Sequence, residues 1–164
     1  HRRRETTLSY FEKRKFDMAI TGFHNIRVTV SDSGAAAKWY GEMLGFEVQS
    51  DSERTPEFSE AVTGVPGATL RVVHMNGHGM HFELMQYVVG SGSRVETSPN
   101  NIGSAQVGFL TDDGPALYAE WKTKRVKMWS PGPAEVPNGP MKGSFIFFCQ
   151  DPDGNALKFM QTPK

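Results

Sequence analysis

Two short segments of the sequence are nearly alike but carry opposite charges at the same place. Residues 82–86 read FELMQ and residues 157–161 read LKFMQ, so Glu83 and Lys158 occupy matching positions. A carboxylate can take and return a proton, and an ammonium group can stabilise negative charge that develops on oxygen. The two residues are therefore candidates for acid–base chemistry, provided that the fold brings the two segments together.

Two amide side chains repeat in the same way. Asn25 lies seven residues before Asp32, Gln106 lies seven residues before Asp113, and each aspartate opens a predicted helix. Arg27 shares the strand face of Asn25, because alternate residues of a strand point the same way. An arginine there either binds a carboxylate, phosphate or enolate of a ligand or forms a salt bridge at the sheet edge. The sequence leaves both interpretations open.

The histidines divide into those near Glu83 and those near a turn. His81 lies two residues from Glu83 and therefore on the same strand face, which favours a place in the pocket. Alternation places His24 on the apolar face that meets a helix, unless a bulge turns it inward. With such a bulge, His24, His81 and Glu83 could hold a divalent metal. His74 and His78 flank a predicted turn and are expected to be exposed.

Composition excludes several classes of protein. The 164 residues contain 18 Lys+Arg and 18 Asp+Glu, so a broad basic face for nucleic acid is not expected. No apolar run is long enough to span a bilayer and no signal peptide is apparent, so no membrane partner is expected. The single Cys149 permits no internal disulfide and is interpreted as an inert buried thiol. It fits a reducing compartment, and we expect a cytoplasmic protein.

Hydrophobic periodicity predicts elements that occur twice in the same order. The first set is a strand over 23–30, a helix over 31–45, a strand over 46–50 and a hairpin over 68–75 and 80–88. A polar stretch without a predicted element separates the strand over 46–50 from this hairpin. The second set is a strand over 104–113, a helix over 114–124, a short strand over 126–130 and a hairpin over 144–150 and 156–161. One such sheet with one helix cannot bury both of its faces, whereas two can curl around a common cavity.

The predicted fold is therefore α+β, with two tandem βαβββ modules that form curved sheets around a central cavity and carry the helices outside. We expect an N-terminal extension over 1–20, a first module over 21–89, a linker over 90–101 and a second module over 102–164. The extension is basic. It is interpreted either as a solvated tail or as an arm that meets an acidic partner.

Four segments together resemble the vicinal-oxygen-chelate superfamily, which includes glyoxalase I, extradiol dioxygenases and bleomycin resistance proteins. They are residues 28–48, 63–75, 82–87 and 147–161. The resemblance implies the paired βαβββ fold. It also implies that enzymes of the family hold one divalent metal at four inward strand positions through His, Glu or Gln. These positions correspond here to Asn25, Glu83, Gln106 and Lys158. Many members of the family are dimers, and a homodimer is expected.

The residues at these four positions depart from the family pattern. Only Glu83 is a good ligand for a divalent ion, since amides are weak ligands and a protonated ammonium group has no lone pair. We therefore predict that no metal is held and that no cofactor is used. In this interpretation the Lys158 ammonium replaces the metal's charge beside Glu83, because a buried carboxylate needs a partner.

Two functions of different classes follow. The first is a metal-independent enzyme, a lyase, isomerase or cyclase that acts on a small organic molecule by acid–base chemistry in the cavity between the modules. Glu83 and Lys158 would be catalytic, and the substrate would be bound by Asn25, Arg27, His81 and Gln106. The alternative is a small-molecule binding or resistance protein that uses the same cavity without catalysis.

Overall fold

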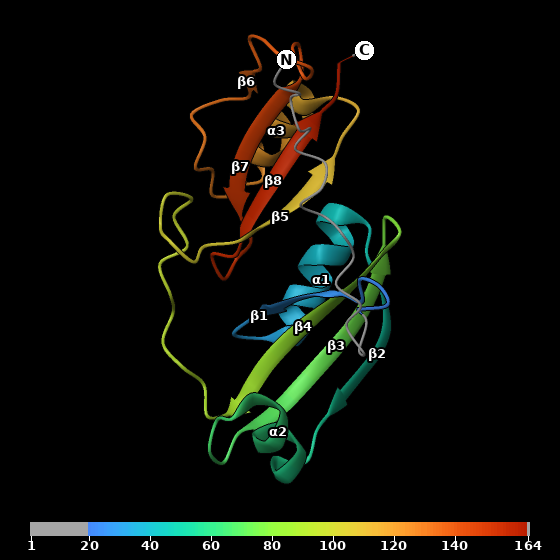
Figure 1. The fold of residues 1–164 in the computed structure, drawn as a ribbon, viewed down its shortest axis with the longest axis vertical. Coiled ribbons are helices and arrows are strands. Elements are labelled where there is room, and N and C mark those ends of the chain that lie inside the picture. Colours follow the sequence, from blue (N-terminus) through green and yellow to red (C-terminus); the bar gives the residue numbers. More distant parts are fainter. Residues whose placement is uncertain (1–19, 164) are drawn as a thin grey trace, which may run out of the picture.

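The computed structural model describes residues 20–163 and contains the predicted pair of βαβββ modules (Figure 1). The predicted α+β fold class is thus confirmed. Of the predicted N-terminal extension, only Ile20 falls within the described residues. No helix within residues 20–163 is long and apolar enough to cross a membrane.

The first module is a four-stranded sheet in the order β1-β4-β3-β2. Its elements are β1 (Ile26–Thr29), α1 (Ser33–Leu44), β2 (Glu47–Glu53), α2 (Pro56–Thr63), β3 (Thr69–Gly77) and β4 (Met80–Val89). Strand β1 runs parallel to β4, and the other two pairings are antiparallel. The central position of β4 brings the residues of β1 and β3 to either side of Glu83.

The second module repeats this topology in the order β5-β8-β7-β6. Its elements are β5 (Gln106–Leu110), α3 (Gly114–Thr123), β6 (Ala134–Glu135), β7 (Phe145–Gln150) and β8 (Ala156–Gln161). Strand β5 runs parallel to β8, which pairs with β7 in the antiparallel sense. Lys158 therefore takes the central place in its sheet that Glu83 takes in the first.

Matching local signals start the two module helices. The side chain of Asp32 accepts a hydrogen bond from the backbone N–H of Ala35 at 2.9 Å, and that of Asp113 accepts one from Ala116 at 2.9 Å. These bonds satisfy backbone donors that a helix N-terminus leaves free. Helix α1 ends at Gly45, whose φ of 71° is left-handed.

Two local predictions were wrong. The polar stretch after β2 contains α2, whose start is marked by the capping side chain of Thr55 and by Pro56 and whose end is marked by Gly64. The short strand predicted over 126–130 is only an isolated bridge between Met128 and Cys149, and the edge strand β6 lies later, in the connection that leads to β7. A two-residue edge strand carries too little periodicity to be recognised.

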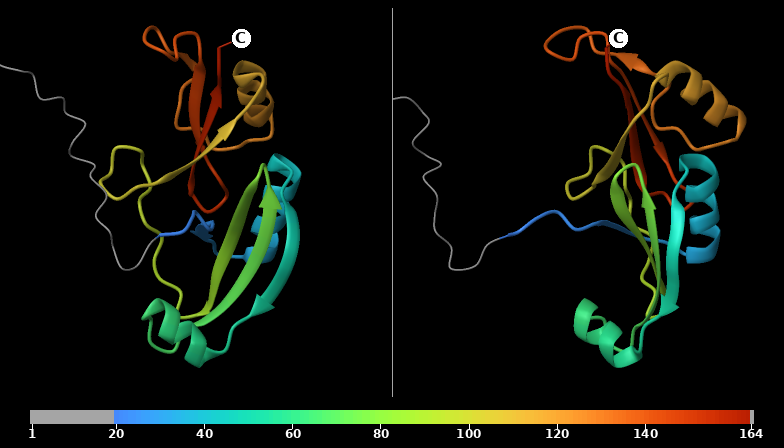
Figure 2. Two further views of the ribbon diagram at one scale, coloured as in Figure 1. Left: turned by 45° about the vertical axis from the view of Figure 1, so that its right-hand side comes forward. Right: turned by 90° about the vertical axis from the view of Figure 1, so that its right-hand side faces the viewer.

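Helices α1 and α3 cover the same side of their sheets (Figure 2). One apolar core runs through both modules on this side. The ring centroids of Trp39 on α1 and Trp121 on α3 are 6.0 Å apart. Strand residues of the other parity, among them Arg27, His74 and Glu83, face away from the helices. The polar site residues are therefore separated from the core by the sheet itself.

Polar contacts join the first module to the turn between β7 and β8 of the second module. The hydroxyl of Tyr40, which is fully buried, donates to Asp151 Oδ2 at 2.9 Å. The backbone N–H of Ser31 donates to Asp153 Oδ2 at 2.9 Å, and Asn155 donates to the carbonyl of Thr29 at 3.3 Å. The turn of the second module thus holds the end of the first strand and the start of the first helix.

Candidate functional site

Glu83 is the centre of a polar cluster on the open face of the first sheet. It is directly opposite Arg27 on β1 and His74 on β3, because these residues are its register partners in the two neighbouring strands. His81 lies two residues earlier on β4 and on the same face. The side chain of Glu83 is only 3% exposed, although this face carries no module helix. Its neighbours therefore cover it.

Arg27 binds one oxygen of the carboxylate. Its Nε–H donates to Glu83 Oε2 at 2.6 Å, and its Nη2 lies 2.6 Å from the same oxygen. The Arg27 side chain is 41% exposed, so the guanidinium group closes the cluster toward solvent. Of the two interpretations that the sequence leaves open for Arg27, the structure contains the salt bridge.

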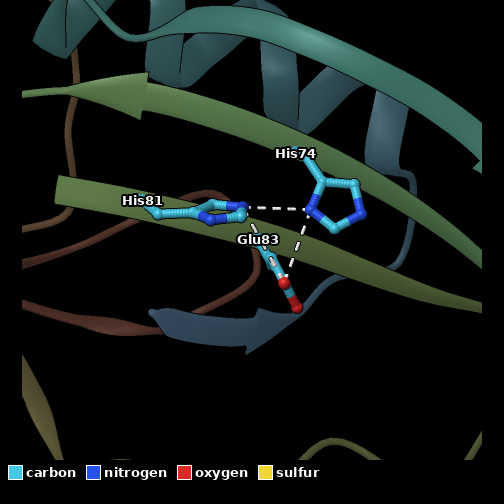
Figure 3. Close-up of side chains that lie close together, drawn as sticks. All are labelled: His74, His81 and Glu83. Carbon is cyan, nitrogen blue, oxygen red and sulfur yellow. Dashed lines mark hydrogen bonds and ion pairs between the residues drawn. The ribbon is translucent and has the colours of Figure 1, made fainter. Parts of the chain in front are cut away.

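The two imidazoles contact the other oxygen. His74 Nδ1 lies 3.4 Å and His81 Nε2 lies 3.8 Å from Glu83 Oε1, and the two ring nitrogens are 3.0 Å apart (Figure 3). These three atoms lie within 4.8 Å of one another, which makes His74, His81 and Glu83 a geometric candidate for a metal site. Both rings are partly exposed, so a ligand can reach them.

The electrostatics keep the carboxylate ionised and an imidazole neutral. Burial acts to raise the pKa of Glu83, but the hydrogen bond and charge of Arg27, supported by Asn25 and His74, outweigh it and leave this pKa below its ordinary value. Burial lowers the pKa of His74, and the Glu83 carboxylate offsets only part of this effect. At neutral pH the cluster therefore contains an ionised Glu83 beside a neutral His74.

The structure corrects what the sequence predicted for His74. It was expected to be exposed beside the turn, but its side chain is only 24% exposed and contacts Glu83. A signal for this was present. The hairpin turn is the two residues His78 and Gly79, both with positive φ, so counting three residues back from the Gly77–Met80 pair places His74 opposite Glu83.

His24 also departs from its predicted place. Alternation put its side chain on the helix-facing side, but β1 begins only at Ile26, so alternation does not constrain residue 24. His24 is exposed, and the centroid of its ring lies 5.3 Å from the centroid of the His81 ring. The group that joins His81 and Glu83 is therefore His74 rather than His24.

The remaining predicted residues are divided between the modules. Half-buried Asn25 precedes β1 beside the cluster, whereas exposed Gln106 opens β5 of the second module. Lys158 is half-buried on β8 between Gly108 and Phe148 of the neighbouring strands. Among residues 20–163, Lys158 forms no ion pair, and the cation paired with Glu83 is Arg27. A catalytic role for Lys158 stays a prediction.

Comparison with known proteins identifies the family. A sequence profile of the Glyoxalase/Bleomycin resistance protein/Dioxygenase superfamily matches residues 22–159. The chain belongs to this superfamily. No curated protein matches its sequence.

Solved structures of the superfamily share the fold at low sequence identity. A glyoxalase family protein from Bacillus cereus has a TM-score of 0.74 and 14% identity, over 90% of this chain and 97% of that one. One from Enterococcus faecalis has a TM-score of 0.62 and 19% identity, over 87% and 99%. The trypanothione-dependent glyoxalase I of Leishmania major has a TM-score of 0.55 and 20% identity, over 84% of each chain.

The four positions that the resemblance relates to the metal ligands of superfamily enzymes do not supply a ligand set for a metal here. Asn25, Gln106 and Lys158 supply two neutral amides and an ammonium group, and the remaining Glu83 already has one oxygen bound to Arg27. A divalent first-row ion requires several imidazole or carboxylate ligands. These four residues together therefore do not form a site for such an ion.

An apolar pocket of about 520 Å³ lies elsewhere, at the junction of the two modules. It is lined by residues of both, including Met43, Met80, Phe109 and Trp121, and it contains no member of the Glu83 cluster. A second, smaller apolar cluster of Leu70, Val72 and Met85 packs on the same side of the first sheet as Glu83 and is itself buried. Among the described residues, the apolar pocket and the Glu83 cluster are therefore separate sites.

Proposed function

We propose that this protein is a metal-independent enzyme of the glyoxalase superfamily, a lyase or isomerase that acts on a small organic molecule by acid–base chemistry. The observation that carries the proposal is the Arg27–Glu83 pair, in which a buried carboxylate is balanced by an arginine of the neighbouring strand. Glu83 is the general base and acid. Arg27, Asn25 and His81 are the groups around it that a substrate meets.

The pair also gives Glu83 a way to become reactive. An anionic substrate that draws Arg27 to its own carboxylate or enolate frees Glu83 Oε2 and removes the charge that holds its pKa low. Burial then raises this pKa toward neutrality, where a carboxylate is a better general base. The proton passes from the carbon next to the substrate carbonyl to Oε2, and the electron pair moves onto the carbonyl oxygen. Lys158 and Gln106 of the second module are proposed to stabilise this oxygen and to bind the substrate.

The test begins with a thermal-shift screen of small carboxylic acids that contain a second carbonyl group, followed by turnover assays in the presence of a chelator. We expect Glu83→Gln to bind the same compound and to turn it over about 10²- to 10⁴-fold more slowly, because the variant keeps the shape but loses the base. Glu57→Gln, at an exposed position in α2, is the matched control. Undiminished turnover by Glu83→Gln excludes Glu83 as the base.

The apolar junction pocket favours a second candidate, a small-molecule binding or resistance protein without catalysis. A ligand held there would not need the Glu83 cluster, since none of the cluster residues lines the pocket. Gly108 does line it, and a Cβ atom added there meets no other atom within 4 Å. A thermal shift that is lost in Gly108→Leu, unchanged in Glu83→Gln and accompanied by no turnover would support this candidate over the enzyme.

We propose in addition that the protein forms a homodimer and works in the cytoplasm. Dimers are common in the superfamily, and the one cysteine, Cys149, is a free and fully buried thiol, which agrees with a reducing compartment. Light scattering coupled to size-exclusion chromatography tests the first point. Fractionation of the producing cell tests the second.

A further inference from the structure

Arg54 contacts the cluster from the side opposite to Glu83. It lies in the connection between β2 and α2, and its backbone N–H donates to the carbonyl of Leu70 at 2.7 Å. In its side chain, Nη1 donates to Ser52 Oγ at 2.6 Å and Nη2 lies 3.2 Å from His74 Nε2. The guanidinium group is thus held against the far nitrogen of the His74 ring.

This contact determines where the His74 ring carries its proton. A guanidinium group has only donors, so the nitrogen that it contacts must accept. A neutral imidazole has one acceptor and one donor nitrogen, and the acceptor here is Nε2. The proton is then on Nδ1, which lies 3.0 Å from His81 Nε2 and 3.4 Å from Glu83 Oε1. Both of these atoms can accept it.

We propose that Arg54 is a positioning residue that fixes the Nδ1–H tautomer of His74 and thereby closes the His74–His81–Glu83 cluster to divalent metal ions. A metal at the cluster needs a lone pair on His74 Nδ1, where this tautomer has a proton. The His81 Nε2 lone pair is engaged by the same proton. The cluster is therefore a hydrogen-bonded chain, although its three ligand atoms lie within 4.8 Å of one another.

The inference deepens the proposed metal-independent function and rests on it for its biological meaning. The tautomer and the metal affinity are measured without substrate, however. The proposed enzyme could fail while Arg54 still sets the tautomer, and the reverse outcome is equally distinguishable.

The tautomer can be read from the histidine nitrogen chemical shifts of the full chain labelled with ¹⁵N-histidine. We expect wild-type His74 to have a protonated Nδ1 and an unprotonated Nε2 at neutral pH. Arg54→Met should abolish this preference, and Arg54→Lys, which restores a cationic donor, should recover it. Arg71→Met is the matched control, because Arg71 lies on β3, the strand of His74, and pairs with Asp51 instead of a histidine. A proton on Nε2 in the wild type, or a pattern that Arg54→Met leaves unchanged, overturns the proposal.

Metal exclusion is tested by titrating Co²⁺ and following its visible absorption. We expect Arg54→Met to bind one Co²⁺ per chain about tenfold or more tightly than the wild type, and the additional change His81→Ala to abolish this binding. Equal binding by the wild type and Arg54→Met, including none by either, contradicts metal exclusion by Arg54. Should Arg54→Met fail to fold, the wild-type nitrogen shifts still decide the tautomer. Arg54→Lys, which keeps a cationic donor, is then expected to bind Co²⁺ with the same affinity as the wild type.

Discussion

The charge of Glu83 is balanced within its own sheet. The carboxylate is almost fully buried, and its partner Arg27 comes from the adjacent strand at the same register position. A carboxylate in this position is costly to ionise unless a cation stays beside it. Arg27 is therefore expected to stabilise the fold as well as to take part in the proposed chemistry.

Replacing Arg27 tests this balance. We expect Arg27→Met to lower the free energy of unfolding by about 2 kcal/mol near pH 7.5. This is less than for a fully buried pair, because Arg27 is partly exposed. In the wild type the pKa of Glu83 is lowered, so the stabilisation is present at neutral pH and is lost as the pH falls through the pKa of the folded state. In the variant, burial raises this pKa, and the loss should be smaller near pH 5.

Urea unfolding of both proteins at the two pH values measures the effect. Arg71→Met breaks the more exposed pair with Asp51 and serves as the control, with an expected loss smaller than that of Arg27→Met. A loss in Arg27→Met that is equally small, or one that grows as the pH falls, would contradict the account of Glu83.

The β3–β4 hairpin is the element that assembles the site. Its turn residues His78 and Gly79 have φ of 53° and 73°, the positive values of a two-residue turn that suits the twist of antiparallel strands. This turn sets the register that places His74 opposite Glu83. A change in the turn is therefore expected to weaken the cluster as well as the hairpin.

Gly79→Ala tests the contribution of the turn. A side chain at this position meets no atom within 4 Å, so the only expected cost is that of a left-handed backbone, about 1 kcal/mol in the free energy of unfolding. Gly132→Ala is the control, since its added atom also meets nothing within 4 Å and its φ lies outside the left-handed range. Equal stability of the two variants in denaturant unfolding would show that the turn carries no conformational constraint.

At the scale of elements, the sequence predicts those with a clear period and misses those without one. The two module helices and the paired hairpins were predicted because apolar periodicity, capping aspartates and turn residues agree at these places. Helix α2 was missed although Thr55, Pro56 and Gly64 mark its ends, because its eight residues are mostly exposed and show no buried apolar stripe, Ser59 being the only buried one. The face of Glu83 and His81 followed from alternation, but the place of His74 required the exact length of the turn.

At the scale of the whole molecule, the two modules form one structural unit. Their helices share a single apolar core, and buried Tyr40 reaches Asp151 of the other module. The pairing of modules was predicted from the repeat. The cation that pairs with Glu83 was not predicted. A repeat shows which residues of the two sheets correspond, but it does not give the distance from a residue of one sheet to a residue of the other. Arg27, two residues from Asn25, was available as a partner within the same sheet.

Tyr40→Phe tests the coupling of the modules. Loss of a buried hydrogen bond to a carboxylate should lower the free energy of unfolding by about 2 kcal/mol while the chain still unfolds in one transition. Tyr118→Phe is the control within one module, because its hydroxyl donates only to the carbonyl of Ser130, and about 1 kcal/mol is expected. Hydrogen exchange should show both sheets losing protection together in Tyr40→Phe. Loss confined to one sheet would mean that the modules are independent.

The most direct test of the central claim is the metal content of the protein, together with its dependence on added metal. The protein should be purified without chelator, analysed by mass spectrometry for divalent ions, and assayed before and after dialysis against chelator with the compound found in the screen. We predict well under one metal ion per chain and the same turnover in both samples. One transition metal per chain, with activity that disappears on its removal and returns on its addition, would contradict a metal-independent acid–base site centred on Glu83 and Arg27.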